Sequence, residues 1–147
     1  MTGFELGTDG PGTILTGVDG SITSLRAGAY AAGMARRQHA HLVVVTVATT
    51  SSLAAMAPGA LTVLNDTAQE LAAEVQGEAK RYLEDLALTG ELVRVQGDAY
   101  AEIVRLADER KVDLVVVGAS TKAGHRIVGS LAGRLVRTGK WPVTVVP

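Results

Sequence analysis

The chain has 147 residues, of which 47% are apolar and only 3% aromatic, and this suits a single domain with an aliphatic core. Its formal net charge of −1 gives no electrostatic basis for binding nucleic acid or an anionic membrane, and the absence of cysteine excludes disulfides and thiolate metal sites. No signal peptide is visible at the start, and no apolar run approaches the roughly 18 residues of a membrane-spanning helix. We therefore expect a soluble, cytoplasmic protein.

Five short apolar runs are predicted to be β-strands. The second and fourth are almost continuous Val and Leu, which is typical of strands covered on both faces. The third alternates apolar with polar residues, which favours a place nearer the edge of a sheet. The predicted strands cover residues 13–18, 41–47, 91–96, 113–117 and 142–146.

Helical patterns lie between these strands. The first helix is rich in Ala and Gly, with Leu25, Ala29 and Ala32 on one stripe, and the second has apolar residues at steps of three and four, including Tyr82. Asp98 is placed to cap the third helix, and Gly139 to end the fourth. The predicted helices cover residues 21–38, 64–88, 99–110 and 131–138.

Strands that alternate with helices along the whole chain predict an α/β fold, in which a parallel sheet is joined by right-handed crossovers. No internal repeat and no second domain is visible. The segment 48–63 is rich in Ala, Ser and Thr, contains Pro58-Gly59 and has no clear period. It is interpreted as a mobile loop after the second strand.

A glycine-containing turn, Gly17-Val18-Asp19-Gly20-Ser21, joins the first predicted strand to the first predicted helix. In a parallel sheet such a turn lies at the carboxyl ends of the strands, where ligands bind beside the point at which the strand order reverses. Asp19 is a candidate to hydrogen-bond a ribose or an adenine edge. Asp19 or Ser21 is also a candidate to cap the helix, and the two roles are compatible.

The fourth predicted strand stops at Gly118, and a loop leads from there to Gly129-Ser130 and the last helix. Glycine lets a ligand approach the backbone, and the helix directs free N–H groups and the positive end of its dipole toward the loop. Proteins hold phosphate groups with this combination of strand, turn and helix. The segment is neither a P-loop nor a GxGxxG fingerprint, so an ordinary connecting loop remains the alternative.

Several segments occur in the order, and near the spacing, of one known family. They are Val18-Asp19-Gly20-Ser21, Gly97-Asp98, Asp113-Leu114-Val115-Val116-Val117-Gly118, Gly129-Ser130 and Pro142-Val143-Thr144-Val145-Val146. Together they resemble the universal stress protein family over residues 13–147, which leaves residues 1–12 as an N-terminal extension. The resemblance implies a Rossmann-like sheet of five parallel strands in the order 3-2-1-4-5, with helices on both faces. It also implies a homodimer that forms by pairing of the last strands, residues 142–146.

One branch of that family binds ATP through the motif Gly-x2-Gly-x9-Gly-(Ser/Thr), and another branch lacks the motif and does not bind ATP. By position, the resemblance implies nucleotide-binding roles at the two turns, at the end of the second strand and at the start of the last helix. Asp19 and Val47 would then lie near the adenosine. The implied residues are Val18, Asp19, Val47, Gly118, Ser120, Thr121, Gly129, Ser130 and Leu131.

The ATP motif is incomplete in this chain. Thr121 stands in place of the second glycine, and seven residues rather than nine separate it from Gly129. If that position needs a positive φ, threonine there is strained. Lys122, His125 and Arg126 could offer positive charge to a phosphate, or they are simply polar residues of an exposed loop. AMP and cyclic AMP need less of this loop than ATP does, so both are candidate ligands.

Two functions follow from these observations. The first is an adenine-nucleotide-binding regulatory protein of stress response or signalling, with ATP and Mg²⁺ across the ends of the first and fourth strands. The second is a dimeric universal stress protein that binds no nucleotide and acts as a protein-interaction module. No catalytic acid, base or nucleophile and no metal-ligand spacing is evident, so we expect at most slow ATP hydrolysis and no resident metal site.

Overall fold

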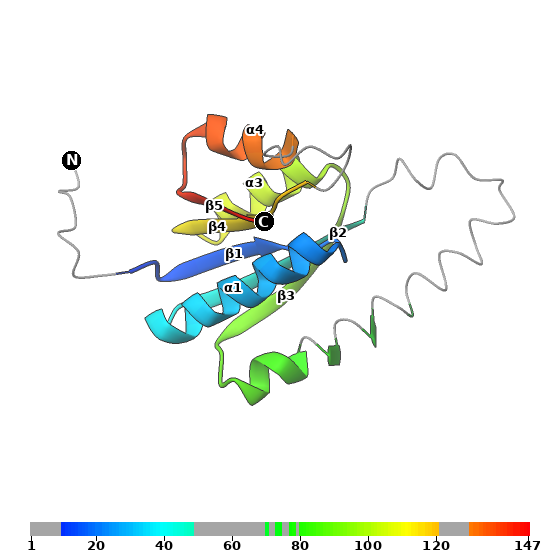
Figure 1. Ribbon diagram of the computed structural model, residues 1–147, viewed down its shortest axis with the longest axis vertical. Helices are drawn as coiled ribbons and strands as arrows, with labels where there is room; N and C mark the ends of the chain where they lie inside the picture. The colour runs from blue at the N-terminus through cyan, green and yellow to red at the C-terminus, as the bar shows by residue number, and fades with distance from the viewer. Residues whose placement is uncertain (1–9, 49–69, 71–72, 75–76, 79, 121–129) are drawn as a thin grey trace, which may run out of the picture.

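A five-stranded, all-parallel sheet forms the centre of the protein (Figure 1). The computed structural model describes residues 10–48, 70, 73–74, 77–78, 80–120 and 130–147. The strands lie in the order β3-β2-β1-β4-β5, which confirms the predicted order 3-2-1-4-5. Their bounds are β1 Thr13–Gly17, β2 His41–Ala48, β3 Gly90–Gln96, β4 Leu114–Gly118 and β5 Val143–Val146.

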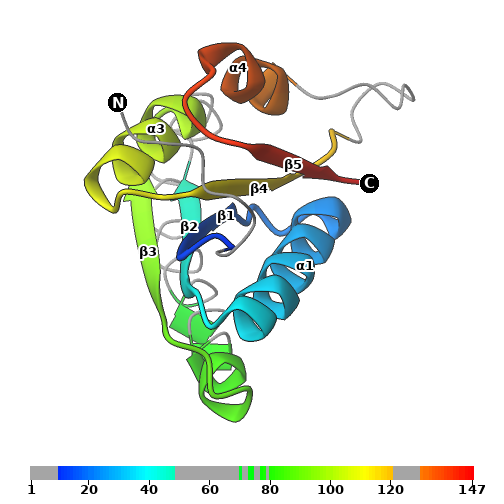
Figure 2. The ribbon, with the colours of Figure 1, turned by 90° about the vertical axis from the view of Figure 1, so that its left-hand side faces the viewer.

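Helices cover both faces of this sheet, as predicted (Figure 2). One face carries α1 and the second helix, whose described residues lie between 70 and 85. The other face carries α3 and α4, which lie side by side. The bounds are α1 Ile22–Gln38, α3 Ala99–Glu109 and α4 Ser130–Thr138.

The two faces are packed by different kinds of side chain. On the α1 face, Ala27 and Ala31 are completely buried, and such short side chains let the helix backbone lie close to the sheet. On the opposite face, larger side chains such as Ile103 of α3 and Leu135 of α4 fill the space. Of the residues predicted on one stripe of α1, Ala32 is buried, whereas Leu25 is 56% exposed and Ala29 is exposed as well. The buried side of α1 is instead formed largely by Ala27, Ala31, Ala32 and Ala35.

The second helix also differs from its prediction. It ends at Asp85, before the predicted end at Leu88. Leu83 is 8% exposed, whereas Tyr82, predicted on the buried stripe, is 53% exposed. At the described end of this helix, Leu83 rather than Tyr82 therefore faces the sheet.

The edges and connections of the sheet follow the predictions closely. β3, with its alternating pattern, lies at one edge as expected, and β5 lies at the other. Ala48 belongs to β2 rather than to the loop predicted over 48–63, and the rest of that segment lies outside the described residues. In the part of the chain that the structure describes, no helix is both long and apolar enough to cross a membrane.

The strand order reverses between β1 and β4, which are hydrogen-bonded neighbours with Thr16 opposite Val116. From β1 the chain runs through β2 to β3 on one side, and then crosses to β4 on the other side of β1. The connections that leave β1 and β4 at their carboxyl ends therefore diverge to opposite faces. Divergence of this kind opens a crevice for a ligand in parallel α/β sheets.

Candidate functional site

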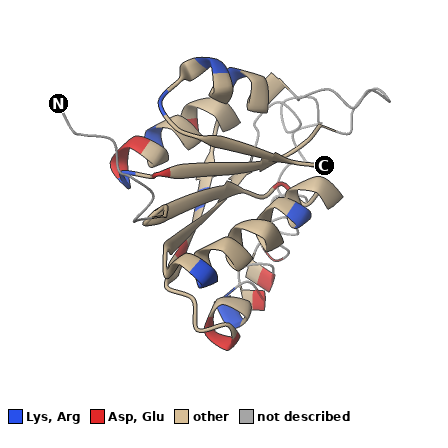
Figure 3. Cartoon of the chain, turned by 60° about the vertical axis from the view of Figure 1, so that its left-hand side comes forward, with Lys and Arg blue, Asp and Glu red and all other residues tan. Residues whose placement is uncertain are grey.

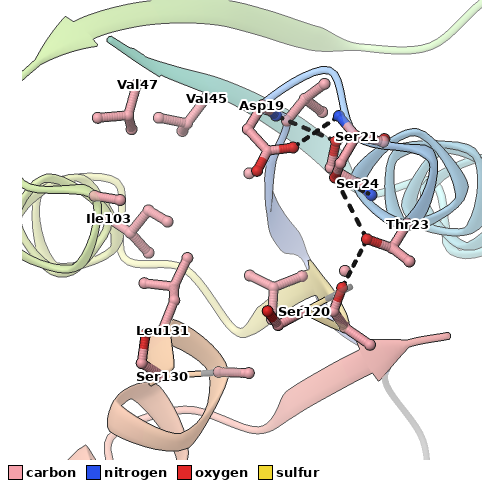
Figure 4. Close-up of a pocket in the computed structure, with 17 residues that line it drawn as sticks. Asp19, Ser21, Thr23, Ser24, Val45, Val47, Ile103, Ser120, Ser130 and Leu131 are labelled. Carbon is pink, nitrogen blue, oxygen red and sulfur yellow. Dashed lines mark hydrogen bonds between the residues drawn. The ribbon is translucent and has the colours of Figure 1, made fainter. Parts of the chain in front are cut away.

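A hollow of about 320 Å³ lies at the carboxyl ends of β1, β2 and β4, where the N-terminal ends of α1, α3 and α4 complete its walls (Figure 4). Every predicted binding residue that the structure describes lines this hollow. These residues are Val18, Asp19, Val47, Gly118, Ser120, Ser130 and Leu131. The remaining two, Thr121 and Gly129, lie outside the described residues, as do Lys122, His125 and Arg126. Residues far apart in sequence thus converge on one crevice.

The hollow has an apolar side and a hydroxyl-bearing side (Figure 4). Branched aliphatic side chains from β2, α3 and α4 form the first, and hydroxyl groups from the start of α1 and from the residues after β4 form the second. The apolar side consists of Val45, Val47, Ile103 and Leu131, and the hydroxyl-bearing side of Ser21, Thr23 and Ser120. A ligand with an apolar, flat part and a polar part matches this division.

Side-chain hydrogen bonds hold the turn between β1 and α1 in place. Ser21 is the N-cap of α1, and its hydroxyl oxygen accepts the N–H of Ser24 at 3.2 Å. Asp19 does not cap the helix; its Oδ1 accepts the N–H of Ser21 at 2.9 Å. The N–H of Asp19 in turn donates to Ser24 Oγ at 3.2 Å. The turn is therefore fixed before any ligand arrives.

Asp19 is the only ionisable side chain among the described residues that line the hollow. Partial burial acts to raise the pKa of Asp19, but hydrogen bonds from the hydroxyl and N–H of Ser21 and from Ser24 outweigh it, so the pKa lies below its ordinary value. The carboxylate is ionised at neutral pH. It favours hydrogen-bond donors on a ligand and repels anionic groups.

Gly118, at the end of β4, lies directly against the first turn of α1. A Cβ atom at this position would lie 2.5 Å from the carbonyl carbon of Thr23 and 2.6 Å from the backbone nitrogen of Ser24. No real Cβ tolerates contacts this short against backbone atoms. The sequence suggested that this glycine lets a ligand approach the backbone. The structure shows that it also lets the first turn of α1 approach β4.

The apolar side is supported by contacts between α3 and α4. Asp98 caps α3 as predicted, since its Oδ2 accepts the N–H of Ala101 at 2.9 Å. Tyr100 is the second residue of α3, and its hydroxyl lies 2.6 Å from Thr138 Oγ1 of α4. The Arg134 guanidinium of α4 lies 3.9 Å from the centre of the Tyr100 ring. These contacts fix the spacing of the two helices that carry Ile103 and Leu131.

The sequence did not identify every residue that shapes this site. Thr23 and Ile103 line the hollow, but neither was predicted as a binding residue. Each lies in the first or second turn of a helix that follows a strand of the sheet. That position was the one signal in the sequence that could have placed these two residues at the site. Among the described residues, no group of His, Cys, Asp and Glu side chains could hold a metal ion.

Comparison with known proteins identifies the family. The model of the universal stress protein family matches residues 11–147. The chain belongs to the universal stress protein family. Among its relatives is universal stress protein MJ0531 of Methanocaldococcus jannaschii, which is 28% identical over 136 residues, covering 90% of this chain and 80% of that protein.

Two solved structures of the family are similar to this chain. Universal stress protein UspA from Lactobacillus plantarum superposes with a TM-score of 0.74 at 26% identity, covering 92% of this chain and 97% of the other. A universal stress protein in complex with cAMP superposes with a TM-score of 0.68 at 32% identity, covering 93% of this chain and 97% of the other. A structural relative at this identity therefore binds an adenine nucleotide.

Proposed function

We propose that this universal stress protein binds an adenine nucleotide in the hollow between β1 and β4 and acts as a regulatory protein of stress response or signalling. The observation that carries the proposal is the convergence of the predicted residues from β1, β2, β4 and α4 on one divided hollow at the switch point of the sheet. The relative that is 32% identical and bound to cAMP supports the same ligand class.

From the division of the hollow we propose a place for each part of the nucleotide. The purine packs against Val47 and Ile103 on the apolar side, where its flat faces are removed from water. The ionised Asp19 accepts a hydrogen bond from a ribose hydroxyl or from the adenine amine and repels phosphate. The phosphate therefore lies toward Ser120 and Ser130, where the N-terminal end of α4 favours negative charge.

The candidate nucleotides share the adenosine part and differ in the charge that the protein must accommodate. AMP and cyclic AMP carry one phosphate, which the hydroxyl groups and helix N-termini of the described walls suit. ATP adds two phosphates and needs Mg²⁺ to offset their charge, and it depends more heavily on the segment 121–129. We propose that AMP or cyclic AMP binds at least as tightly as ATP, and that any hydrolysis of ATP is slow.

Calorimetric titration of the full chain with AMP, cyclic AMP, ATP and Mg·ATP tests this proposal. Val47→Trp fills the apolar side and should abolish binding, whereas Val136→Trp is a matched control, because Val136 is 54% exposed on α4 and lines no part of the hollow. Circular dichroism of both variants checks that they fold. If none of the four ligands gives heat at millimolar concentration, the nucleotide proposal fails and the interaction module becomes the better hypothesis.

We further propose a homodimer formed through β5. The N–H groups of Val115 and Ala119 donate to the carbonyls of Pro142 and Val146, so alternate residues of this edge strand bond to β4. The backbone groups of Val145, between them, consequently point away from β4 and are available to a second copy. Val145→Pro removes the outward N–H and should yield a monomer in sedimentation, while Val145→Ala keeps that N–H and should remain a dimer. A monomeric wild-type protein at micromolar concentration would contradict the proposal.

A further inference from the structure

The hydroxyl group of Thr23 joins the start of α1 to the residues that follow β4 (Figure 4). Thr23 lies in the first turn of α1, is 8% exposed, and donates from Oγ1 to the carbonyl oxygen of Ala119 at 2.7 Å. The two residues are 96 positions apart in the chain. Ser21 Oγ lies 3.4 Å from the same Thr23 oxygen, so the contact continues the hydrogen bonds that fix the β1–α1 turn.

Both backbone groups of Ala119 are held by hydrogen bonds. Its N–H donates to the Val146 carbonyl at the end of β5, at 2.8 Å, and its carbonyl accepts from Thr23. Ala119 directly follows β4 and is followed by Ser120, and both residues line the hollow. The Thr23 hydrogen bond therefore sets the direction in which the chain leaves the sheet at the hydroxyl-bearing side.

We infer that Thr23 is a positioning residue for the phosphate-binding half of the site. The inference rests on the proposed adenine-nucleotide function and deepens it. By holding Ala119 against α1, Thr23 places Ser120 where the phosphate is received. The purine half is formed by Val47, Ile103 and Leu131 from other elements, and it does not depend on this hydrogen bond. The two halves can therefore be separated by experiment.

The test compares the affinities of AMP and adenosine for three variants of the full chain. Thr23→Val keeps the side-chain shape but removes the donor, Thr23→Ala is a second variant without the donor, and Thr23→Ser keeps the donor. We expect Thr23→Val and Thr23→Ala to bind AMP about tenfold more weakly and adenosine within twofold of wild type. Thr23→Ser should bind both ligands within about twofold of wild type.

Equal losses for AMP and adenosine, no loss for either, or a Thr23→Ser variant that behaves like Thr23→Val would each overturn the inference. Amide hydrogen exchange of the ligand-free protein gives an independent readout. Thr23→Val should speed exchange at the Ala119 N–H and leave the Val116 N–H in β4 unchanged. A wild-type protein that binds neither ligand refutes the nucleotide proposal, whereas unchanged exchange at Ala119 refutes the positioning role by itself.

Discussion

Two glycine-containing turns meet at the hollow, one over residues 17–21 after β1 and one over residues 118–120 after β4. In the first, Gly20 has a φ of +87° and nothing within 4 Å of the place where a Cβ would lie. In the second, Gly118 has no positive φ, but the backbone of Thr23 occupies the space of its missing side chain. Gly20 is therefore required by its backbone conformation, whereas Gly118 is required because there is no space for a side chain.

The distinction shows how differently the two turns contribute to the site. The first is a locally determined structure, since its hydrogen bonds join Asp19, Ser21 and Ser24, which are close in sequence. The second depends on tertiary contacts with α1 and β5 through Ala119. Charge distinguishes them as well, because Asp19 carries a carboxylate in the first turn and residues 118–120 carry no ionisable side chain. Elsewhere the charged residues lie mainly on the helices, and the strands of the sheet carry few (Figure 3). Substitutions in the two turns should therefore have different consequences.

The largest effect is expected from Gly118→Ala. The added Cβ would overlap backbone atoms of α1, which cannot move aside as a flexible side chain can, and we expect a loss of about 3 kcal/mol in the free energy of unfolding. The melting temperature should fall by roughly 6–12 °C, as measured by thermal denaturation.

Gly33→Ala is the matched control for that substitution. Gly33 lies inside α1 with open space around its missing Cβ, so alanine should stabilise the protein by about 0.5–1 kcal/mol. If Gly118→Ala lowers the free energy of unfolding by less than about 1 kcal/mol, the fold does not depend on the close approach of α1 to β4 that the structure shows.

A smaller loss is expected from Gly20→Ala. Because L-residues with a side chain are disfavoured in the left-handed region, this substitution should cost about 1–2 kcal/mol in urea denaturation. Gly20→Asn should cost less, since asparagine tolerates this conformation better. Equal losses for the two variants would show that the positive φ is not what selects glycine here.

The fold was predictable because its strongest signals are local. Nearly continuous Val and Leu in β2 and β4 indicated buried parallel strands, and the alternation in β3 indicated an edge, as observed. The orientation of the helices was harder to predict. α1 turns Ala27 and Ala31 inward and leaves Leu25 exposed, because close approach to the sheet favours short apolar side chains over long ones.

The candidate site was predictable only in part. Topology places both turns at the same end of the sheet, and therefore the motif residues converged as expected. The Thr23–Ala119 hydrogen bond joins residues 96 positions apart, and no pattern in the sequence records such a contact. The packing of α1 against Gly118 was missed for the same reason, since a sequence shows that a side chain is absent but not what fills its place.

Ser21→Ala should cost about 1 kcal/mol in urea denaturation, because it removes the N-cap of α1. Ser21→Thr keeps an oxygen in the same place and should cost only a few tenths of a kcal/mol. The alanine variant should also raise the pKa of Asp19 toward its ordinary value, because the Ser21 hydroxyl is one of the groups that lower it. An alanine variant as stable as wild type would show that the first turn does not depend on its cap.

The smallest effect concerns acid sensitivity, which should differ between the two turns. The pKa of Asp19 in the folded protein lies below the ordinary value of 3.8, so the unfolded chain takes up a proton at Asp19 before the folded one does as pH falls. The stability that Asp19 contributes is therefore complete above about pH 4 and is lost as the pH drops through the folded pKa.

Urea unfolding at pH 7 and at pH 3 should show a smaller acid-induced loss of unfolding free energy for Asp19→Asn than for wild type. The Gly118→Ala variant keeps every carboxylate and should retain the acid-induced loss of wild type in full. If Asp19→Asn retains that loss as well, the hydrogen bonds from Ser21 and Ser24 do not favour the ionised carboxylate over the neutral acid in the folded protein.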